Sequence, residues 1–239
     1  MRRFNILMTN YNNGQYIETA ILSIIKQTFK DWYLIIVDDA STDNSCLIIE
    51  KYVKLYPDKI KFIRNIDNKG YSLSLREGVK YVSTDIFGIV DSDDAITIDA
   101  LEIMYKSHMQ HPSIGLIYSQ FMYCDDSLSP VDIGYCGNIP TGKTSLEEGL
   151  VSHFKTFKLK YYLLTDGFHK ENQKAIDKDI VYKMEEVSSI LFVNRILYMY
   201  RCHEKGISQG ENVKKALQDK KKAKWEARER RKRRNSERT

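Results

Sequence analysis

The feature that most constrains the fold is an alternation, across residues 4–123, between short β-type runs and segments with helical periodicity. The runs are rich in Ile, Val, Phe and Tyr and are short enough for buried strands. They cover Ile6–Thr9, Tyr33–Val37, Ile60–Arg64, Ile86–Val90 and Ile114–Tyr118. Between them, apolar residues recur at helical spacing after polar residues that can cap a helix. This order predicts an α/β fold, with a mostly parallel sheet and helices on both faces.

Composition excludes several classes of protein. The chain has 239 residues, 42% of them hydrophobic, which is too apolar for a disordered chain. Its longest unbroken apolar run, Trp32–Val37, is far shorter than the roughly 20 residues that span a bilayer. The N-terminus has a basic start but lacks the cleavage site of a secretory signal. We therefore expect a cytoplasmic protein, whose four scattered cysteines are reduced thiols.

Polar and acidic side chains follow three of the predicted strands. Thr9-Asn10-Tyr11 ends the first strand, Asp38-Asp39 follows the second, and Asp91-Ser92-Asp93-Asp94 follows the fourth. Open α/β sheets bind their ligands beyond the carboxyl ends of the strands. The sequence therefore predicts that the functional site lies at this edge of the sheet.

The segment Asp91–Asp94 has two interpretations. Alternate carboxylates at the end of a buried strand suit Mg²⁺ or Mn²⁺, and the free coordination positions of the cation suit phosphate oxygens. The alternative is that Asp93 or Asp94 caps the helix that follows, because a carboxylate accepts hydrogen bonds from free N–H groups at a helix start. The local pattern leaves both interpretations open.

The pair Asp38-Asp39 also suits two classes of protein. Phospho-accepting receiver modules carry such a pair, but their phosphorylated Asp follows a neighbouring strand. Here the next predicted strand, Ile60–Arg64, is followed by Asn65. The remaining interpretation is nucleotide recognition, in which one carboxylate accepts a hydrogen bond from a base and a neighbour binds a ribose hydroxyl.

Five segments in this order and spacing resemble the family 2 glycosyltransferases, which are inverting enzymes. These segments are Ile6–Asn12, Ile24–Trp32, Ile35–Asp43, Asn68–Gly70 and Val90–Asp94. Three later segments are similar less densely: Asp166–His169, Ala175–Asp179, and Tyr200–His203 with its continuation to Ser208. The resemblance implies the nucleotide-diphospho-sugar transferase fold, also called the A-type glycosyltransferase fold.

The resemblance also implies a nucleotide site. Thr9, Tyr11 and Asp39 would hold the nucleoside, with Tyr11 packing against the base and Asp39 accepting a hydrogen bond from it. Asp91 would lie near the ribose. The donor would be a nucleotide-diphosphate sugar, with UDP as the expected nucleotide.

A metal site and a catalytic base follow from the same resemblance. Asp93 would be the main carboxylate contact to Mn²⁺ or Mg²⁺ at the diphosphate, and His203 a second contact to the metal or the diphosphate. Asp177 stands at the position of the family's catalytic carboxylate, so it would remove the proton of the acceptor hydroxyl. These roles imply transfer with inversion to a hydroxyl of a glycan or lipid-linked acceptor, in polysaccharide or glycoconjugate synthesis.

One departure from the family pattern affects the base. Ile176 replaces the acid that usually precedes Asp177, so Asp177 either works alone or shares the work with Asp179. The departure also keeps a second function open, a catalytically inactive nucleotide-sugar-binding protein on the same fold.

Four basic or titratable residues are further candidates for substrate contact. Arg76 is displaced from the family's usual Arg-Asn pair, and Lys69 is the alternative phosphate contact. His153 and Lys155 precede the expected acceptor side of the site.

The chain divides by composition into three parts. Residues 1–123 form the expected nucleotide-sugar-binding half, 124–210 the acceptor-side half, and 211–239 a basic tail. Residues 214–239 carry a net charge of +9, whereas the rest carries −4. The tail suits a solvated extension with a frayed or isolated helix, or peripheral contact with the anionic inner face of the cell membrane, with Trp225 as an anchor. We expect no nucleic-acid partner, because the body is acidic and lacks a base-reading module.

Overall fold

The computed structural model describes residues 3–170, 176–203 and 213–236. The first half contains β1 (Phe4–Asn10), α1 (Ile17–Ile25), β2 (Trp32–Asp38), α2 (Ser45–Leu55), β3 (Ile60–Arg64), α3 (Tyr71–Val79), β4 (Ile86–Ile89), β5 (Ala95–Ile96), α4 (Ala100–Gln110) and β6 (Ile114–Cys124). The second half contains β7 (Pro130–Ile133), α5 (Ser145–Glu148), β8 (Thr156–Lys158), α6 (Leu159–Tyr162), α7 (Ile176–Val187), β9 (Ser189–Arg201) and α8 (Val213–Ser236). All five strands and all four helices expected within residues 4–123 are present.

The described strands form one mixed sheet in the order β3-β2-β1-β4-β8-β6-β9-β5, with β7 paired to β6. Strands β3, β2, β1 and β4 are parallel, as expected. The direction changes at β8, which pairs antiparallel with both β4 and β6. Because β6 crosses residue 123, the two expected halves share one sheet; the boundary expected at residue 210 lies outside the described residues.

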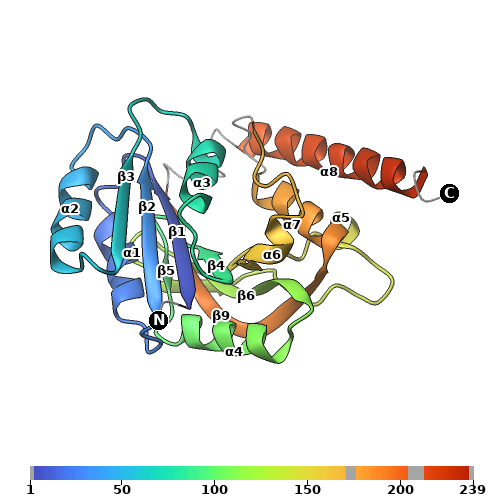
Figure 1. Ribbon diagram of the computed structural model, residues 1–239, viewed down its shortest axis with the longest axis horizontal. Helices are drawn as coiled ribbons and strands as arrows, with labels where there is room; N and C mark the ends of the chain where they lie inside the picture. The colour runs from blue at the N-terminus through green and yellow to red at the C-terminus, as the bar shows by residue number, and fades with distance from the viewer. Residues whose placement is uncertain (1–2, 171–175, 204–212, 237–239) are drawn as a thin grey trace.

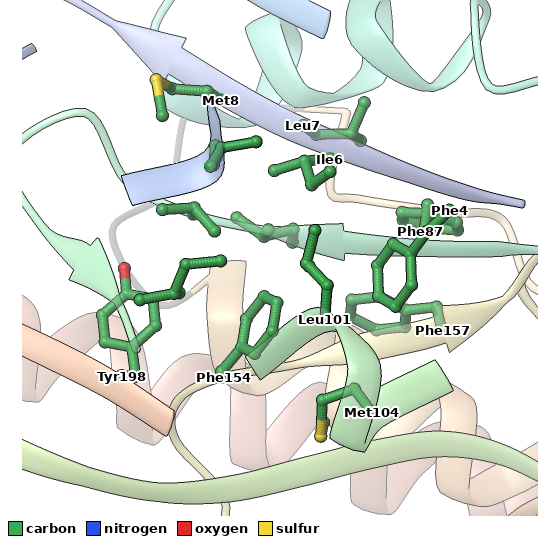
Figure 2. Packing of buried hydrophobic residues seen from close by; sticks show 14 of the residues in the cluster. Phe4, Ile6, Leu7, Met8, Phe87, Leu101, Met104, Phe154, Phe157 and Tyr198 are labelled. Carbon is green, nitrogen blue, oxygen red and sulfur yellow. The ribbon is translucent and has the colours of Figure 1, made fainter. Parts of the chain in front are cut away.

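The core lies on both sides of the parallel strands. All seven residues of β1 are buried, as a strand covered on both faces requires. Helix α3 packs closely on β1 and β2 at Gly78. A Cβ atom added to this glycine would lie 3.3 Å from Val37 Cγ2 and 3.4 Å from Leu7 Cδ2. Figure 1 shows α1 and α2 on the other side of these strands. Figure 2 shows Ile6 of β1 and Leu101 of α4 in the same buried cluster. This rigid packing fixes the strand ends that build the site.

Helix α8 corrects the expectation of a solvated tail. Its alanines Ala223 and Ala227 are buried, and Arg230 pairs with Asp179 and Glu186 of α7, each at 3.2 Å. The contact forms because α7 presents carboxylates that face the arginines of α8 across the two helices. The tail is therefore a helix docked on the body of the protein, neither isolated nor solvated on all sides (Figure 1).

Candidate functional site

A cleft of about 520 Å³ opens at the carboxyl ends of β1, β2 and β4. Its lining includes all seven residues that the resemblance assigns to the nucleotide, the metal and the base: Thr9, Tyr11, Asp39, Asp91, Asp93, Asp177 and His203. These residues come from segments far apart in the chain. The fold thus brings them together at the edge of the sheet where parallel α/β sheets bind ligands.

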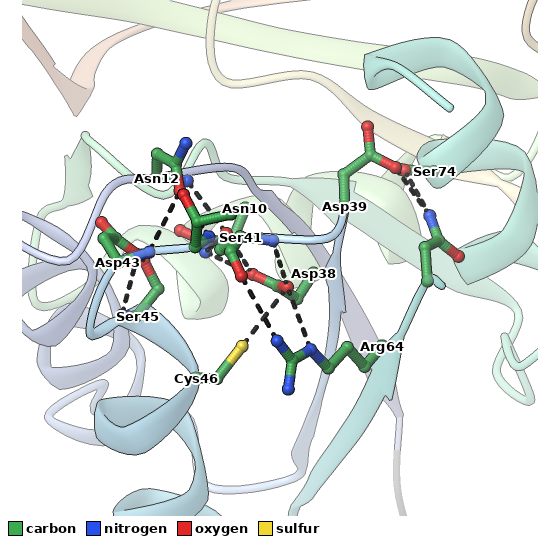
Figure 3. A network of polar contacts seen from close by, with 12 residues as sticks. Asn10, Asn12, Asp38, Asp39, Ser41, Asp43, Ser45, Cys46, Arg64 and Ser74 are labelled. Atoms are coloured by element: carbon green, nitrogen blue, oxygen red, sulfur yellow. Dashed lines mark hydrogen bonds and ion pairs between the residues drawn. The ribbon is translucent and has the colours of Figure 1, made fainter. Parts of the chain in front are cut away.

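The two carboxylates at the end of β2 have different surroundings. Asp38 is fully buried and accepts hydrogen bonds from Asn10 Nδ2 at 2.7 Å and Ser41 N at 2.9 Å (Figure 3). Successive residues of an extended chain point to opposite sides, so Asp39 faces the cleft instead. Asp38 ties the loops after β1 and β2 together, and Asp39 is the one of the two that borders the cleft.

Asp39 is held in place by the loop before α3. Its carboxylate accepts hydrogen bonds from Asn65 Nδ2 at 2.8 Å, Lys69 N at 2.9 Å and Gly70 N at 2.6 Å. Gly70 has φ 88°, in the left-handed region that favours glycine. The Asn68–Gly70 segment therefore positions Asp39.

Tyr11 also lines the cleft and is 49% exposed, so its ring can pack against a base.

Three carboxylates crowd the end of β4. Burial and the charge of Asp93 raise the pKa of Asp91 to about 6. Burial, followed by the charges of Asp93 and Asp91, raises the pKa of Asp94 well above its ordinary value. Asp91 also accepts a hydrogen bond from the Tyr71 hydroxyl at 2.9 Å. A bound cation would offset this concentration of negative charge.

Asp93 and His203 fit a cation. Oδ2 of Asp93 lies 3.0 Å from Nε2 of His203, and the His203 side chain is buried. Among the described residues, Nδ1 of His203 has no hydrogen-bond partner. Carboxylate and imidazole are ligand types that Mn²⁺ accepts.

A second group is also suited to a cation. Asp91, Asp94 and His153 each place one possible ligand atom within 4.8 Å of the others. Both oxygens of Asp94 already accept hydrogen bonds, however, from the Tyr198 hydroxyl at 2.8 Å and from Arg201 N at 2.7 Å. Asp93 is therefore freer to bind a metal than Asp94.

The alternative role of Asp93 or Asp94 as a helix cap is wrong, because α4 begins at Ala100 with Asp99 at its N-cap.

The two acids in the first turn of α7 also differ. Asp177 lines the cleft and is half-buried. Asp179 is buried on the other side of the helix, 2.6 Å from Lys183 Nζ and 3.2 Å from Arg230 Nη1. Asp179 is therefore held in ion pairs, and Asp177 is the acid that can reach a substrate.

The two candidate phosphate contacts do not line the cleft. Arg76 Nη1 donates to the backbone oxygens of Asp166 at 2.9 Å and Phe168 at 2.6 Å, so it holds the turn before α7. Lys69 contributes its backbone N–H to Asp39. Arg76 is therefore engaged in holding this turn, and a phosphate contact by the Lys69 side chain stays a prediction.

Other residues complete the cleft. His153 and Lys155, the candidates for acceptor contact, line it. Tyr135, Lys178 and Lys220, which no sequence motif indicated, line it as well. No local signal marks Lys220, because it stands in a basic run and reaches the cleft only through the docking of α8. Ala175 and residues 204–208 of the motif segments lie outside the described residues.

Residues 5–164, about two thirds of the chain, match the family described as Glycosyl transferase family 2. The chain belongs to this family. The resemblance seen in the sequence is thus confirmed, and the glycosyltransferase has the α/β nucleotide-diphospho-sugar transferase fold.

Several bacterial proteins are similar in sequence to this glycosyltransferase. Chondroitin synthase of Escherichia coli is 27% identical over 209 residues, covering 87% of this chain and 29% of that protein. Hyaluronan synthase of Pasteurella multocida is 28% identical over 202 residues, covering 83% and 20%. The minor teichoic acid biosynthesis protein GgaA of Bacillus subtilis is 37% identical over 121 residues, covering 48% and 27%. The glycosyltransferase spans less than a third of the length of these relatives.

Solved structures share the fold. S. aureus TarS 1–349 in complex with UDP has a TM-score of 0.72 at 20% identity, over 84% of this chain and 61% of that one. The mannosyltransferase PcManGT from Pyrobaculum calidifontis, in complex with GDP-Man and Mn²⁺, has a TM-score of 0.67 at 17% identity, over 86% and 59%.

Proposed function

We propose that this glycosyltransferase moves a sugar from a UDP-linked donor to a hydroxyl of a glycan or lipid-linked acceptor, with inversion, in polysaccharide or glycoconjugate synthesis. The observation that carries the proposal is the convergence of seven motif residues, from distant segments, on one cleft. The relatives named for chondroitin, hyaluronan and teichoic acid synthesis support a glycan acceptor. The TarS complexes with UDP and UDP-GlcNAc support the nucleotide.

In the proposed donor site, Tyr11 packs against the base while Thr9 and Asp39 hold the nucleoside. Asp39 suits this role because backbone N–H groups fix its carboxylate at the cleft surface. Asp91 lies beyond Asp39 along the sheet edge, where it can accept from a ribose hydroxyl.

In the proposed reaction, Asp177 takes the proton of the acceptor hydroxyl, and this oxygen attacks the anomeric carbon from the face opposite the diphosphate. Asp93 and His203 would hold a divalent cation, Mn²⁺ or Mg²⁺. When bound, such a cation offsets the charge that develops on the leaving diphosphate.

A panel of nucleotide sugars tests the donor assignment. With Mn²⁺ present, UDP-linked sugars should raise the melting temperature more than GDP-linked sugars, because selective binding to the native state stabilises it. At about 100 times Kd the stabilisation is about 2.7 kcal/mol, which corresponds to roughly 5–10 °C for a chain of this size. Equal shifts for both nucleotides would refute a UDP-specific site.

The same protein separates an enzyme from an inactive binder. A competent site slowly releases UDP from the stabilising donor without acceptor, whereas a binding protein shifts the melting temperature and releases none. Ile176, which leaves Asp177 without a neighbouring acid, is the feature that favours the inactive alternative.

We also propose peripheral contact with the anionic cytoplasmic surface of the membrane through the outer face of α8. No helix in the described ranges is both long and apolar enough to cross a membrane. Leu217, Lys221, Trp225 and Arg228 follow one another at helical spacing and are exposed, with Trp225 61% exposed. Lys and Arg near anionic lipid each contribute about 1 kcal/mol, and Trp favours the interface.

Substitutions on this face test the contact better than removal of the docked helix. The double variant Trp225→Ala and Arg228→Ala should cosediment with vesicles containing phosphatidylglycerol about tenfold more weakly than the parent at low salt. The exposed Lys106→Ala on α4 is the control. If the double variant sediments as well as Lys106→Ala does, the outer face of α8 is not a membrane contact.

A further inference from the structure

Three lysines from three different elements enter the cleft on the side of Asp177. Lys155 directly precedes β8, Lys178 lies in α7, and Lys220 lies in α8. The residues proposed to bind the nucleoside come instead from the ends of β1 and β2. Lys178 and Lys220 are therefore placed where an acceptor, rather than the nucleoside, is expected, and Lys155 lies near Asp91, on which its charge acts.

Two of these lysines are buried and form no ion pair with a described carboxylate, although the charge of Lys155 acts on Asp91. Lys155 and Lys178 are each 7% exposed. Lys155 Nζ donates to the backbone oxygen of Ser152 at 2.5 Å, and Lys178 Nζ donates to that of Val151. Within the described ranges no carboxylate forms an ion pair with either ammonium group. An ammonium group has three N–H donors and is costly to bury unpaired, so both retain the capacity to bind an anion.

The buried Lys183 provides a contrast within the same helix as Lys178. Its Nζ lies 2.6 Å from Asp179 Oδ2 and 2.9 Å from Asp166 Oδ1. The fold thus pairs a buried lysine with carboxylates where the lysine is structural. Among the described residues it pairs no carboxylate with Lys155 or Lys178, which line the cleft.

Aromatic side chains line the cleft together with the two lysines. The Tyr135 hydroxyl lies 3.4 Å from Lys178 Nζ, and the His153 ring stacks on Tyr198 with centroids 4.7 Å apart. Burial and the positive charges of Lys155 and Lys178 hold the pKa of His153 well below its ordinary value, so this ring is neutral. Flat rings beside ammonium groups suit a sugar that carries a negative charge.

Two of the lysines and Asp177 meet at Tyr135. Burial raises the pKa of Tyr135, and the opposite charges of Asp177 and Lys220 both act on its hydroxyl. Lys178 contacts the same hydroxyl and follows Asp177 in the chain. A sugar hydroxyl presented to Asp177 therefore lies close to the ammonium groups of Lys178 and Lys220.

We propose that Lys155, Lys178 and Lys220 form an anion-binding acceptor subsite, so that the acceptor carries a carboxylate or phosphate group next to its reacting sugar hydroxyl. This inference rests on the proposed transfer reaction. The shared chemistry is a negatively charged oxygen group, which a uronic acid or a polyol phosphate supplies.

Binding of simple probes to the full chain, saturated with UDP and Mn²⁺, tests the subsite. Methyl glucuronide is compared with the matched neutral methyl glucoside, and glycerol phosphate with glycerol, by calorimetric titration. At least one anionic probe should bind about tenfold or more tightly than its neutral partner, because charge-assisted hydrogen bonds form only with the anion. The probe with the larger preference identifies a uronic acid or a phosphate as the natural group.

Lysine variants assign the preference to the proposed residues. Lys178→Met and Lys220→Met should each reduce the preference for the anion by about tenfold, whereas Lys178→Arg, which keeps the charge, should retain most of it. Lys220 is exposed, so its variant remains informative if Lys178→Met fails to fold. The exposed Lys80→Met is the matched control.

Two results would overturn the subsite. One is equal affinity of the parent for the charged and neutral members of both pairs. The other is a loss of UDP affinity in the lysine variants that equals their loss of probe affinity. The lysines would then bind the donor and not the acceptor. A parent that binds no UDP would instead contradict the proposed function, and the UDP titration reports this separately.

Discussion

Asp177→Asn should lower sugar transfer by about 10²- to 10⁴-fold while donor affinity changes little. Asn preserves the size of the side chain but cannot accept the proton of the acceptor hydroxyl. Asp177 is the acid of α7 that lines the cleft, and Asn in its place creates no charge or cavity in the core. The measurement is the rate of UDP release with acceptor, together with UDP affinity by titration.

Asp179→Asn is the matched control for this variant. Asp179 is buried against Lys183 and Arg230, so its loss should lower the melting temperature and leave the transfer rate of the folded protein largely intact. Loss of a general base usually costs about 10²-fold or more in rate. If Asp177→Asn retains more than about a tenth of the transfer rate while Asp179→Asn abolishes transfer, the base is therefore Asp179. If neither variant slows transfer, the base lies elsewhere.

The structure also explains why Asp177 lacks an acidic neighbour. Ile176 is 2% exposed and belongs to the hydrophobic core. An acid in this position would bury an unpaired carboxylate, which is destabilising. Restoring the family's acid at Ile176 alone is therefore not a route to higher activity, and Asp177 is expected to work without a partner.

Asp93→Ala should abolish the Mn²⁺-dependent part of nucleotide-sugar binding. Asp93 lies beside His203 and is freer than Asp94, whose two oxygens are already hydrogen-bonded. Alanine removes the carboxylate without adding bulk, and UDP-sugar affinity should then be the same with and without Mn²⁺. Calorimetric titrations of UDP-sugar, with Mn²⁺ and with a chelator, measure this difference.

Asp85→Ala is a suitable control, because Asp85 is exposed just before the opposite end of β4. It should keep the full response to Mn²⁺. If Asp93→Ala keeps the response as well, the cation is held by other groups, and the arrangement of Asp91, Asp94 and His153 becomes the alternative.

The parallel half of the fold could be predicted from the sequence because each strand there is a short apolar run that ends in polar residues. The same rule located Thr9, Asp39 and Asp91 at one edge of the sheet. β8 has only three residues, so no pattern revealed that it separates β4 from β6. The change of strand direction at this point could not be predicted.

Contacts between distant segments account for the other differences. Nothing in the sequence shows that Arg76 binds the backbone before α7, because its partners lie about 90 residues away. Likewise, a run of lysines and arginines is typical of a solvated tail until the carboxylates of α7 are known to face it. Lys220 reaches the cleft only through that contact.

The position of β4 has a consequence for synthesis on the ribosome. Its four residues, Ile86–Ile89, are buried between β1 and β8. β6 pairs with β8 rather than with β4, so the apolar edge of β4 has no neighbour until residues 156–158 have emerged. An uncovered apolar strand edge is a template for pairing with other chains. The nascent glycosyltransferase is therefore expected to expose an aggregation-prone edge from the time β4 has emerged until β8 has emerged.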